Sequence, residues 1–111
     1  MSANNVIITT TENVPGYKVT KVYGEVFGIT TRSRNMFSTF GQNMKTIVGG
    51  EIVGYTKLQH AARDQSIERL KIAASERGAN AVVMMRFDSN SFAAVNEVTA
   101  YGTAVSIEPI K

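Results

Sequence analysis

The stretch "TKLQHAARDQSIERLKIAASER", residues 56–77, carries the clearest secondary-structure signal of the chain. It is rich in good helix formers and has no internal glycine or proline. Thr56 is placed to cap its start, and Gly78 follows its end. One stripe of this helix carries mostly small side chains, so we expect the helix to lie close to a sheet. That core stripe consists of Ala62, Ser66, Ile67, Leu70, Ala73 and Ala74.

The helix has two further faces. A narrower apolar stripe lies away from the first, whereas a helix in a solitary small domain needs only one such stripe. We therefore interpret the second stripe as a surface for a partner chain. It consists of Leu58, Ala61, Gln65 and Ile72. The polar face consists of His60, Asp64, Glu68, Lys71 and Ser75.

Segments on both sides of this helix predict strands. Residues 6–10 ("VIITT") are β-branched, and Pro15 and Gly16 then indicate a turn. Residues 17–31 alternate imperfectly, and Gly24 and Gly28 indicate a bend or bulge in a long strand. Residues 79–87 ("ANAVVMMRF") predict a strand buried on both faces that ends at "DSNS". Residues 95–108 alternate well, and one row is small, so the helix or another subunit packs closely on it.

Residues 33–48 predict a second, shorter helix. Its apolar residues recur at helical spacing and it is followed by Gly49 and Gly50. The order of elements is strand, long strand, helix, helix, strand, strand. We therefore expect residues 1–111 to form a single α+β domain of two layers, with a mainly antiparallel sheet, one long helix and one shorter helix.

Composition excludes several classes of function. The net charge of +3 comes from scattered basic residues, so we expect no nucleic-acid partner. The absence of cysteine excludes disulfides, thiolate metal sites and a cysteine nucleophile. The beginning "MSANNVIITT" lacks the features of a signal peptide, and no apolar run approaches the length of a membrane span. We expect a cytoplasmic location and no membrane association.

The polar helix face raises the question of a metal site. His60, Asp64 and Glu68 follow one another at steps of four residues, about one helical turn, so they stack on one side and could hold zinc or a similar ion. The alternative is an ordinary solvated face on which Glu68 pairs with Lys71. One imidazole and two carboxylates make a weak site for a soft metal, so we favour the solvated face.

A small-anion site is a second possibility. Gly49, Gly50 and Gly54 precede the long helix with Glu51 and Tyr55 among them, although a plain connection between two helices explains the glycines as well. Arg63 and Arg86 either make structural ion pairs, with Glu51 as a partner, or line a recess for an anion or carboxylate. No serine lies in a G-x-S-x-G elbow, so we do not expect hydrolase chemistry.

Three blocks of the chain resemble one known family. The run "NVPGYKVTKVYGEVFGITTRSRN", the block "GGEIVGYTKL" and the pair "GANAVVMMRFDS" and "EVTAYGTAV" resemble the YbjQ family, also called UPF0145. The resemblance implies a subunit of dodecin-like architecture that assembles into a ring-shaped pentamer. It also brings a label of heavy-metal binding, without a ligand set that transfers to particular residues.

Together these observations predict a cytoplasmic homo-oligomer without enzymatic activity that binds a small ligand or anion at subunit junctions. The residues expected to bind it are Glu51, Tyr55, Arg63 and Arg86. One alternative is a heavy-metal-binding module that uses His60, Asp64 and Glu68, and another is an enzyme of unknown reaction. The sequence names no cofactor.

Overall fold

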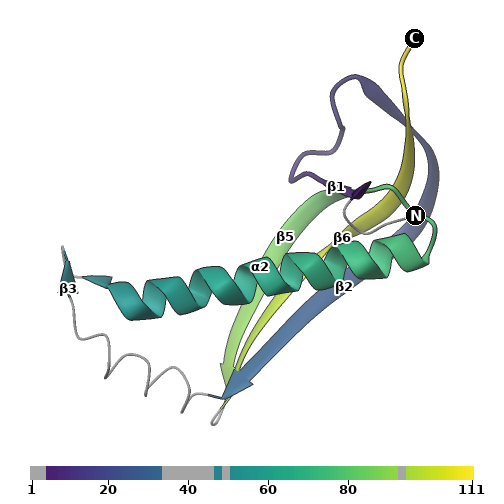
Figure 1. The fold of residues 1–111 in the computed structure, drawn as a ribbon. Coiled ribbons are helices and arrows are strands. Elements are labelled where there is room, and N and C mark those ends of the chain that lie inside the picture. Colours follow the sequence, from purple (N-terminus) through teal and green to yellow (C-terminus); the bar gives the residue numbers. More distant parts are fainter. Residues whose placement is uncertain (1–4, 34–46, 49–50, 93–94) are drawn as a thin grey trace.

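The protein is described from a computed structural model. It covers residues 5–33, 47–48, 51–92 and 95–111, and for residues 33, 47–48, 51–55 and 92 it describes the backbone alone. The elements in chain order are β1 (Ile7–Ile8), β2 (Tyr17–Ser33), β3 (Ile47–Val48), β4 (Glu51–Ile52), α2 (Val53–Glu76), β5 (Ala81–Phe92) and β6 (Val95–Pro109) (Figure 1).

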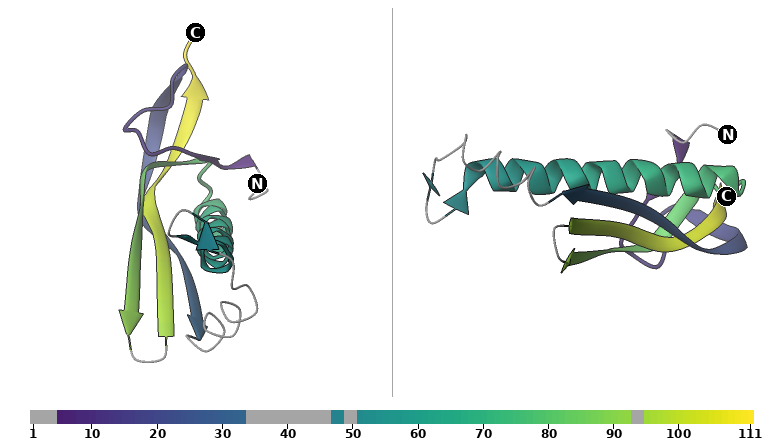
Figure 2. Two further views of the ribbon diagram at one scale, coloured as in Figure 1. Left: turned by 90° about the vertical axis from the view of Figure 1, so that its left-hand side faces the viewer. Right: turned by 90° about the horizontal axis from the view of Figure 1, so that it is seen from below.

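The larger described sheet has the strand order β1-β5-β6-β2. β1 pairs with β5 in parallel, whereas β5 with β6 and β6 with β2 are antiparallel. α2 covers one face of this sheet (Figure 2), so the predicted two-layer α+β fold with a mainly antiparallel sheet is confirmed. β3 and β4 pair with each other at the N-terminal end of α2, away from the four-stranded sheet (Figure 1). Among the described residues, no helix combines the length and the apolar character that crossing a membrane requires.

α2 packs on the sheet at very short range, as its stripe of small residues predicts. A Cβ atom added to Gly28 of β2 would lie 2.0 Å from the carbonyl oxygen of Ser66 and 2.4 Å from the amide nitrogen of Leu70. The core between the layers is therefore built from small and medium side chains, with Leu70 and Ala74 fully buried. The row of small residues in β6 lies under the helix, and two of its members, Ala100 and Ala104, belong to this core.

A buried hydroxyl pair connects the two layers. The Ser66 hydroxyl lies 3.0 Å from Thr30 Oγ1, from the carbonyl oxygen of Ala62 and from the carbonyl oxygen of Val98. Ser66 and Thr30 are both buried, and a buried hydroxyl without a partner is costly. The contact with Ala62 lies within α2, whereas the contacts with Thr30 and Val98 fix the height of α2 above β2 and β6.

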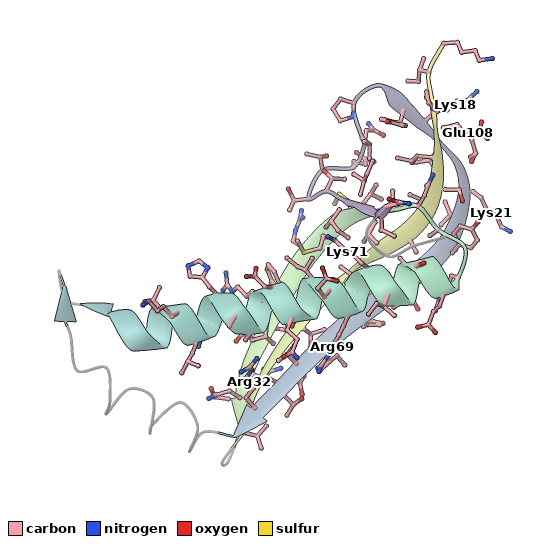
Figure 3. All side chains as sticks on the ribbon, in the orientation of Figure 1. Lys18, Lys21, Arg32, Arg69, Lys71 and Glu108 are labelled. Atoms are coloured by element: carbon pink, nitrogen blue, oxygen red, sulfur yellow. The ribbon has the colours of Figure 1, made fainter. Side chains whose placement is uncertain are left out.

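Two arginines, one in α2 and one directly after its end, also contact the backbone of β2. Arg69 donates to the carbonyl oxygen of Ile29, and Arg77 donates to the carbonyl oxygen of Tyr23 at 2.9 Å. Arg69 lies between α2 and β2, with Arg32 near the end of that strand (Figure 3). β2 is an edge strand, so part of its backbone has no neighbouring strand to bond with. The two guanidinium groups provide hydrogen-bond donors to carbonyl groups of this strand.

The face of the sheet opposite α2, here called the far face, is partly covered by the N-terminal segment. Val14 packs against a second apolar cluster on this face, and the segment is held to β5 by backbone hydrogen bonds from Thr9 and Met84. Ala81 and Val83 are thus buried, as predicted for a strand covered on both faces. The cluster consists of Ala81, Val83, Val105 and Ile107.

β5 carries a bulge that the sequence pattern did not predict. The register of β5 against β6 shifts between Val83 and Arg86, and Met84 has a φ of 56°. Met84 is 43% exposed, whereas Met85 is 7% exposed and belongs to the core. The strand predicted to be buried throughout therefore turns one side chain outward. In β2 the predicted irregularity is confirmed, because the register shifts between Val22 and Gly24.

Four predicted boundaries or faces differ from the structure. α2 begins at Val53, so Thr56 lies inside the helix and does not cap it. The predicted shorter helix lies in residues outside the described ranges, except for Ile47–Val48, which form β3 because β-branched residues suit a strand. β5 continues to Phe92, since pairing with β6 satisfies the backbone of "DSNS". Leu58 is buried, whereas the helical wheel placed it on the stripe interpreted as a surface for a partner chain.

Candidate functional site

The polar face of α2 holds the three candidate metal ligands. His60, Asp64 and Glu68 are all exposed, and the Glu68 carboxylate pairs with the Lys71 ammonium at 3.9 Å, as the solvated-face interpretation predicts. In the part of the chain that the structure describes, no three histidine or carboxylate side chains are grouped so that they could share a metal ion. The spacing along α2 is thus the only feature of these residues that favours a metal.

The four predicted ligand residues fall in different places. Glu51 lies in β4 and Tyr55 in the first turn of α2, and the side chains of both lie outside the described set. Arg63 lies on α2, on the side of the sheet that the helix covers. Arg86 points to the opposite face, because it is paired with Tyr101 while its neighbour Phe87 is paired with Ala100 of the core. Arg63 and Arg86 therefore do not line one recess.

Arg86 has a structural role in the described part of the chain. It is exposed rather than buried, and its Nη1 donates to the carbonyl oxygens of Thr10 at 3.0 Å and of Met85 at 2.9 Å. Its partners are thus backbone carbonyl groups rather than a carboxylate. The hydrogen bond to Thr10 fastens the N-terminal segment to β5.

Arg63 differs from the other arginines that the structure describes. Its guanidinium lies over the Phe87 ring, 5.1 Å from the ring centroid. Arg32 donates to Gln65, and Arg69, Arg77 and Arg86 donate to backbone carbonyls. Among the described residues, none accepts a hydrogen bond from Arg63 or forms an ion pair with it. The stacked guanidinium therefore keeps its N–H donors for solvent or for a ligand.

A shallow hollow adjoins this arginine. It has a volume of about 240 Å³ and is lined by Thr56, Gln59, His60 and Arg63. All four side chains can donate a hydrogen bond, and none carries a negative charge. Sequence reasoning named Arg63 and His60 for different sites and missed Gln59 and Phe87. The helical spacing of residues 56, 59, 60 and 63 could have grouped them, but the stacking on Phe87 depends on how the helix docks.

A second candidate surface lies on the far face. Phe27 is 53% exposed, Ile29 is 47% exposed and Tyr101 is 38% exposed. Phe27 is directly opposite Tyr101 in the β2–β6 register, with ring centroids 6.4 Å apart, and Ile29 is opposite Thr99. These three side chains, here called the open patch, form one contiguous apolar surface that neither α2 nor the N-terminal segment covers.

The open patch has a polar border. Glu25 precedes the patch on β2, and Glu97 precedes it on the antiparallel β6 and so lies at its opposite end. Asp88 and Arg86 lie beside the patch on β5 by the pairing of the strands. An apolar centre with a charged rim of both signs is the usual composition of a protein–protein interface. Sequence reasoning placed Phe27 and Ile29 on one side of a strand and Tyr101 in an alternating row. It did not predict that β2 and β6 bring these residues together.

The fold and these surfaces define a small α+β domain with an exposed apolar patch on one sheet face. The family described as "Putative heavy-metal-binding" (YbjQ) matches residues 6–108. The UPF0145 protein YjfJ of Lactococcus lactis is 62% identical over 105 residues, which are 95% of this chain and 97% of that protein. A UPF0145 protein of Oenococcus oeni is 57% identical over 104 residues, covering 94% of this chain and 99% of that protein. The chain belongs to the YbjQ family, whose members are also named UPF0145 proteins.

The fold is also found in a solved structure. A crystal structure of a protein of unknown function of the DUF74 family, from Pediococcus pentosaceus, has a TM-score of 0.57 and covers 93% of this chain and 98% of its own. The two sequences are 15% identical, so this likeness concerns the fold alone.

Proposed function

We propose that this protein is a homo-oligomer without enzymatic activity, assembled as a pentameric ring in the cytoplasm, which binds a small ligand or anion at its subunit junctions. The observation that carries the proposal is the open patch. Complete burial of a large apolar side chain is worth about 1.5–3 kcal/mol, and Phe27, Ile29 and Tyr101 each leave a third or more of their surface in water. A second copy of the chain that covers the open patch would recover this free energy.

Two further features support assembly. The domain is small, and small domains bury a modest share of their surface, so association is a common source of additional stability. The β3–β4 ladder has two residues in each strand and lies away from the four-stranded sheet (Figure 1). A two-stranded ladder is marginally stable by itself, so packing against another chain would stabilise it.

The number of subunits comes from the resemblance to the family and is tested by mass. Five chains of 12.1 kDa have a mass of about 60 kDa. Native mass spectrometry and light scattering at micromolar protein concentration are expected to give this value. A monodisperse monomer under these conditions would refute the proposal.

Two isoleucines provide a matched test of the contact surface. Ile29 in the open patch and Ile72 on α2 are both 47% exposed, so Ile→Ser removes the same group from each surface. We expect Ile29→Ser to lower the mass or to weaken association at least about tenfold, which follows from the loss of roughly 1.5 kcal/mol of apolar burial. Ile72→Ser is expected to leave association nearly unchanged. The reverse result would place the subunit contact on the second helical stripe and would refute the argument from the open patch.

The description of the family supplies a second candidate function, a heavy-metal-binding module. In this chain it would use His60 with Asp64 and Glu68, which lie on consecutive turns of α2. Calorimetric titration with zinc, copper and nickel, on the wild type and on His60→Ala, tests it. Equal heat from both proteins would remove His60 from any metal site.

A further inference from the structure

We propose that the hollow lined by Thr56, Gln59, His60 and Arg63 binds a phosphate-type oxyanion, such as inorganic phosphate or a small phosphate monoester. This names the ligand class for the anion-binding half of the proposed function and rests on that half, but it places the anion on the α2 surface of one chain rather than at a subunit junction. Of the residues predicted to bind the ligand, the hollow includes Arg63 but not Arg86. Arg86 donates to the N-terminal segment and lies on the other face of the sheet.

The first argument is the state of the guanidinium. An arginine that binds its own chain uses its donors there, as Arg69 and Arg77 do with carbonyls of β2. The Arg63 guanidinium carbon lies over the Phe87 ring, 5.1 Å from the ring centroid, and a cation–π contact uses none of the N–H donors for a hydrogen bond. The ring therefore helps to position the guanidinium before any ligand arrives. An oriented guanidinium fork with unused donors suits an oxyanion.

The second argument is the composition of the lining. Gln59 and His60 lie one turn before Arg63, and Thr56 lies one turn before them, so all four side chains project from one side of α2. Gln59 and His60 supply an amide and an imidazole beside the guanidinium. A carboxylate presents two oxygen atoms, whereas a phosphate presents three or four in a tetrahedral arrangement. Donors of three kinds around one hollow therefore match a phosphate better.

The third argument is space and charge. The hollow of about 240 Å³ is several times the share of volume that one water molecule occupies in the liquid, about 30 Å³, so an ion with a small organic group fits. The carboxylate of Asp64 lies one turn after His60 and is exposed, but it does not line the hollow. Among the described residues that line the hollow, Arg63 therefore supplies the positive charge and none supplies a negative one.

The test is a calorimetric titration of the full chain in a phosphate-free buffer with inorganic phosphate, phenyl phosphate and acetate. Saturable binding of both phosphate compounds, and weaker binding of acetate, is expected. Arg63→Gln is expected to weaken phosphate binding at least about tenfold, since a charge-assisted hydrogen-bonded contact is lost. Lys57→Gln makes the same change of charge on the same helix outside the hollow, and it is expected to change binding less than about twofold because an exposed charge is screened.

Arg63→Lys keeps the charge and removes the fork, so it separates geometry from simple attraction. It is expected to weaken binding several-fold, and circular dichroism checks that each variant keeps its helix and sheet. Any of four results would overturn the proposal: no saturable phosphate binding, equal losses in Arg63→Gln and Lys57→Gln, full binding by Arg63→Lys, or acetate bound as tightly as phosphate. Light scattering on each sample shows separately whether the protein is assembled. The hollow lies on one chain, so a protein that is monomeric but binds phosphate would refute the assembly and not this proposal, and an assembled protein that binds no phosphate would refute this proposal alone.

Discussion

Gly28→Ala tests how strongly the short distance between α2 and β2 supports the fold. Gly28 has an ordinary strand conformation, so the substitution introduces no backbone strain and tests space alone. The new Cβ would lie 2.0 Å from the carbonyl oxygen of Ser66 and 2.4 Å from the backbone nitrogen of Leu70, and both are backbone atoms that cannot rotate away. The helix must therefore retreat by about 1 Å or more to reach an ordinary contact distance.

The magnitude follows from two contributions. Overpacking of a close-packed core costs roughly 1–3 kcal/mol. A retreat of about 1 Å would also lengthen the 3.0 Å contacts of the Ser66 hydroxyl beyond hydrogen-bonding range, and a buried unsatisfied hydroxyl costs about 1–3 kcal/mol. We therefore expect Gly28→Ala to lower the free energy of unfolding by about 4 kcal/mol, a large fraction of the 5–15 kcal/mol that is typical of a domain.

The assay is urea unfolding followed by far-ultraviolet circular dichroism, with all variants at one protein concentration because the proposed association would make stability depend on concentration. Gly16→Ala is the control. Gly16 has a φ of 85° with no atom within 4 Å of the added Cβ, so only the backbone strain of about 1–2 kcal/mol is expected. If the free energy of unfolding of Gly28→Ala lies within about 1 kcal/mol of the wild-type value, the reasoning on helix height is wrong.

Two further pairs of variants each compare a buried residue with an exposed one. Ser66→Ala leaves the buried Thr30 hydroxyl without its partner and is expected to cost about 1–3 kcal/mol in urea unfolding, whereas the exposed Ser89→Ala should cost less than about 0.5 kcal/mol; equal effects would contradict a role for the hydroxyl pair. Met84→Gly is expected to change stability by less than about 1 kcal/mol, because relief of the positive φ offsets the loss of an exposed side chain, while Met85→Gly should cost about 3 kcal/mol or more. Similar losses at both methionines would show that the outward turn at Met84 is incorrect.

Much of the fold could be predicted because local patterns suffice for it. The helical period of residues 56–77 places Ser66, Leu70 and Ala74 on one side, and all three are fully buried. The alternation of residues 95–108 gives both the strand and its face of small residues, which lies under α2. These patterns reflect the geometry of a single element, so no knowledge of its neighbours is required.

Other features could not be predicted, because they depend on how two distant elements meet. A helical wheel gives angles around the axis of α2 but not its height above the sheet. Leu58 therefore looked like part of a partner surface, although it is buried in the structure. The bulge at Met84 likewise depends on the register of β5 against β6.

The candidate sites show the same division. The sequence by itself determined the family, the long helix, the main strands and the absence of thiol chemistry, because residue types and their spacing along one chain define these properties. Only the tertiary structure placed Phe27 beside Tyr101 and the Arg63 guanidinium over Phe87. Both contacts join residues that are far apart in the sequence, and strand register and helix docking decide whether such residues meet.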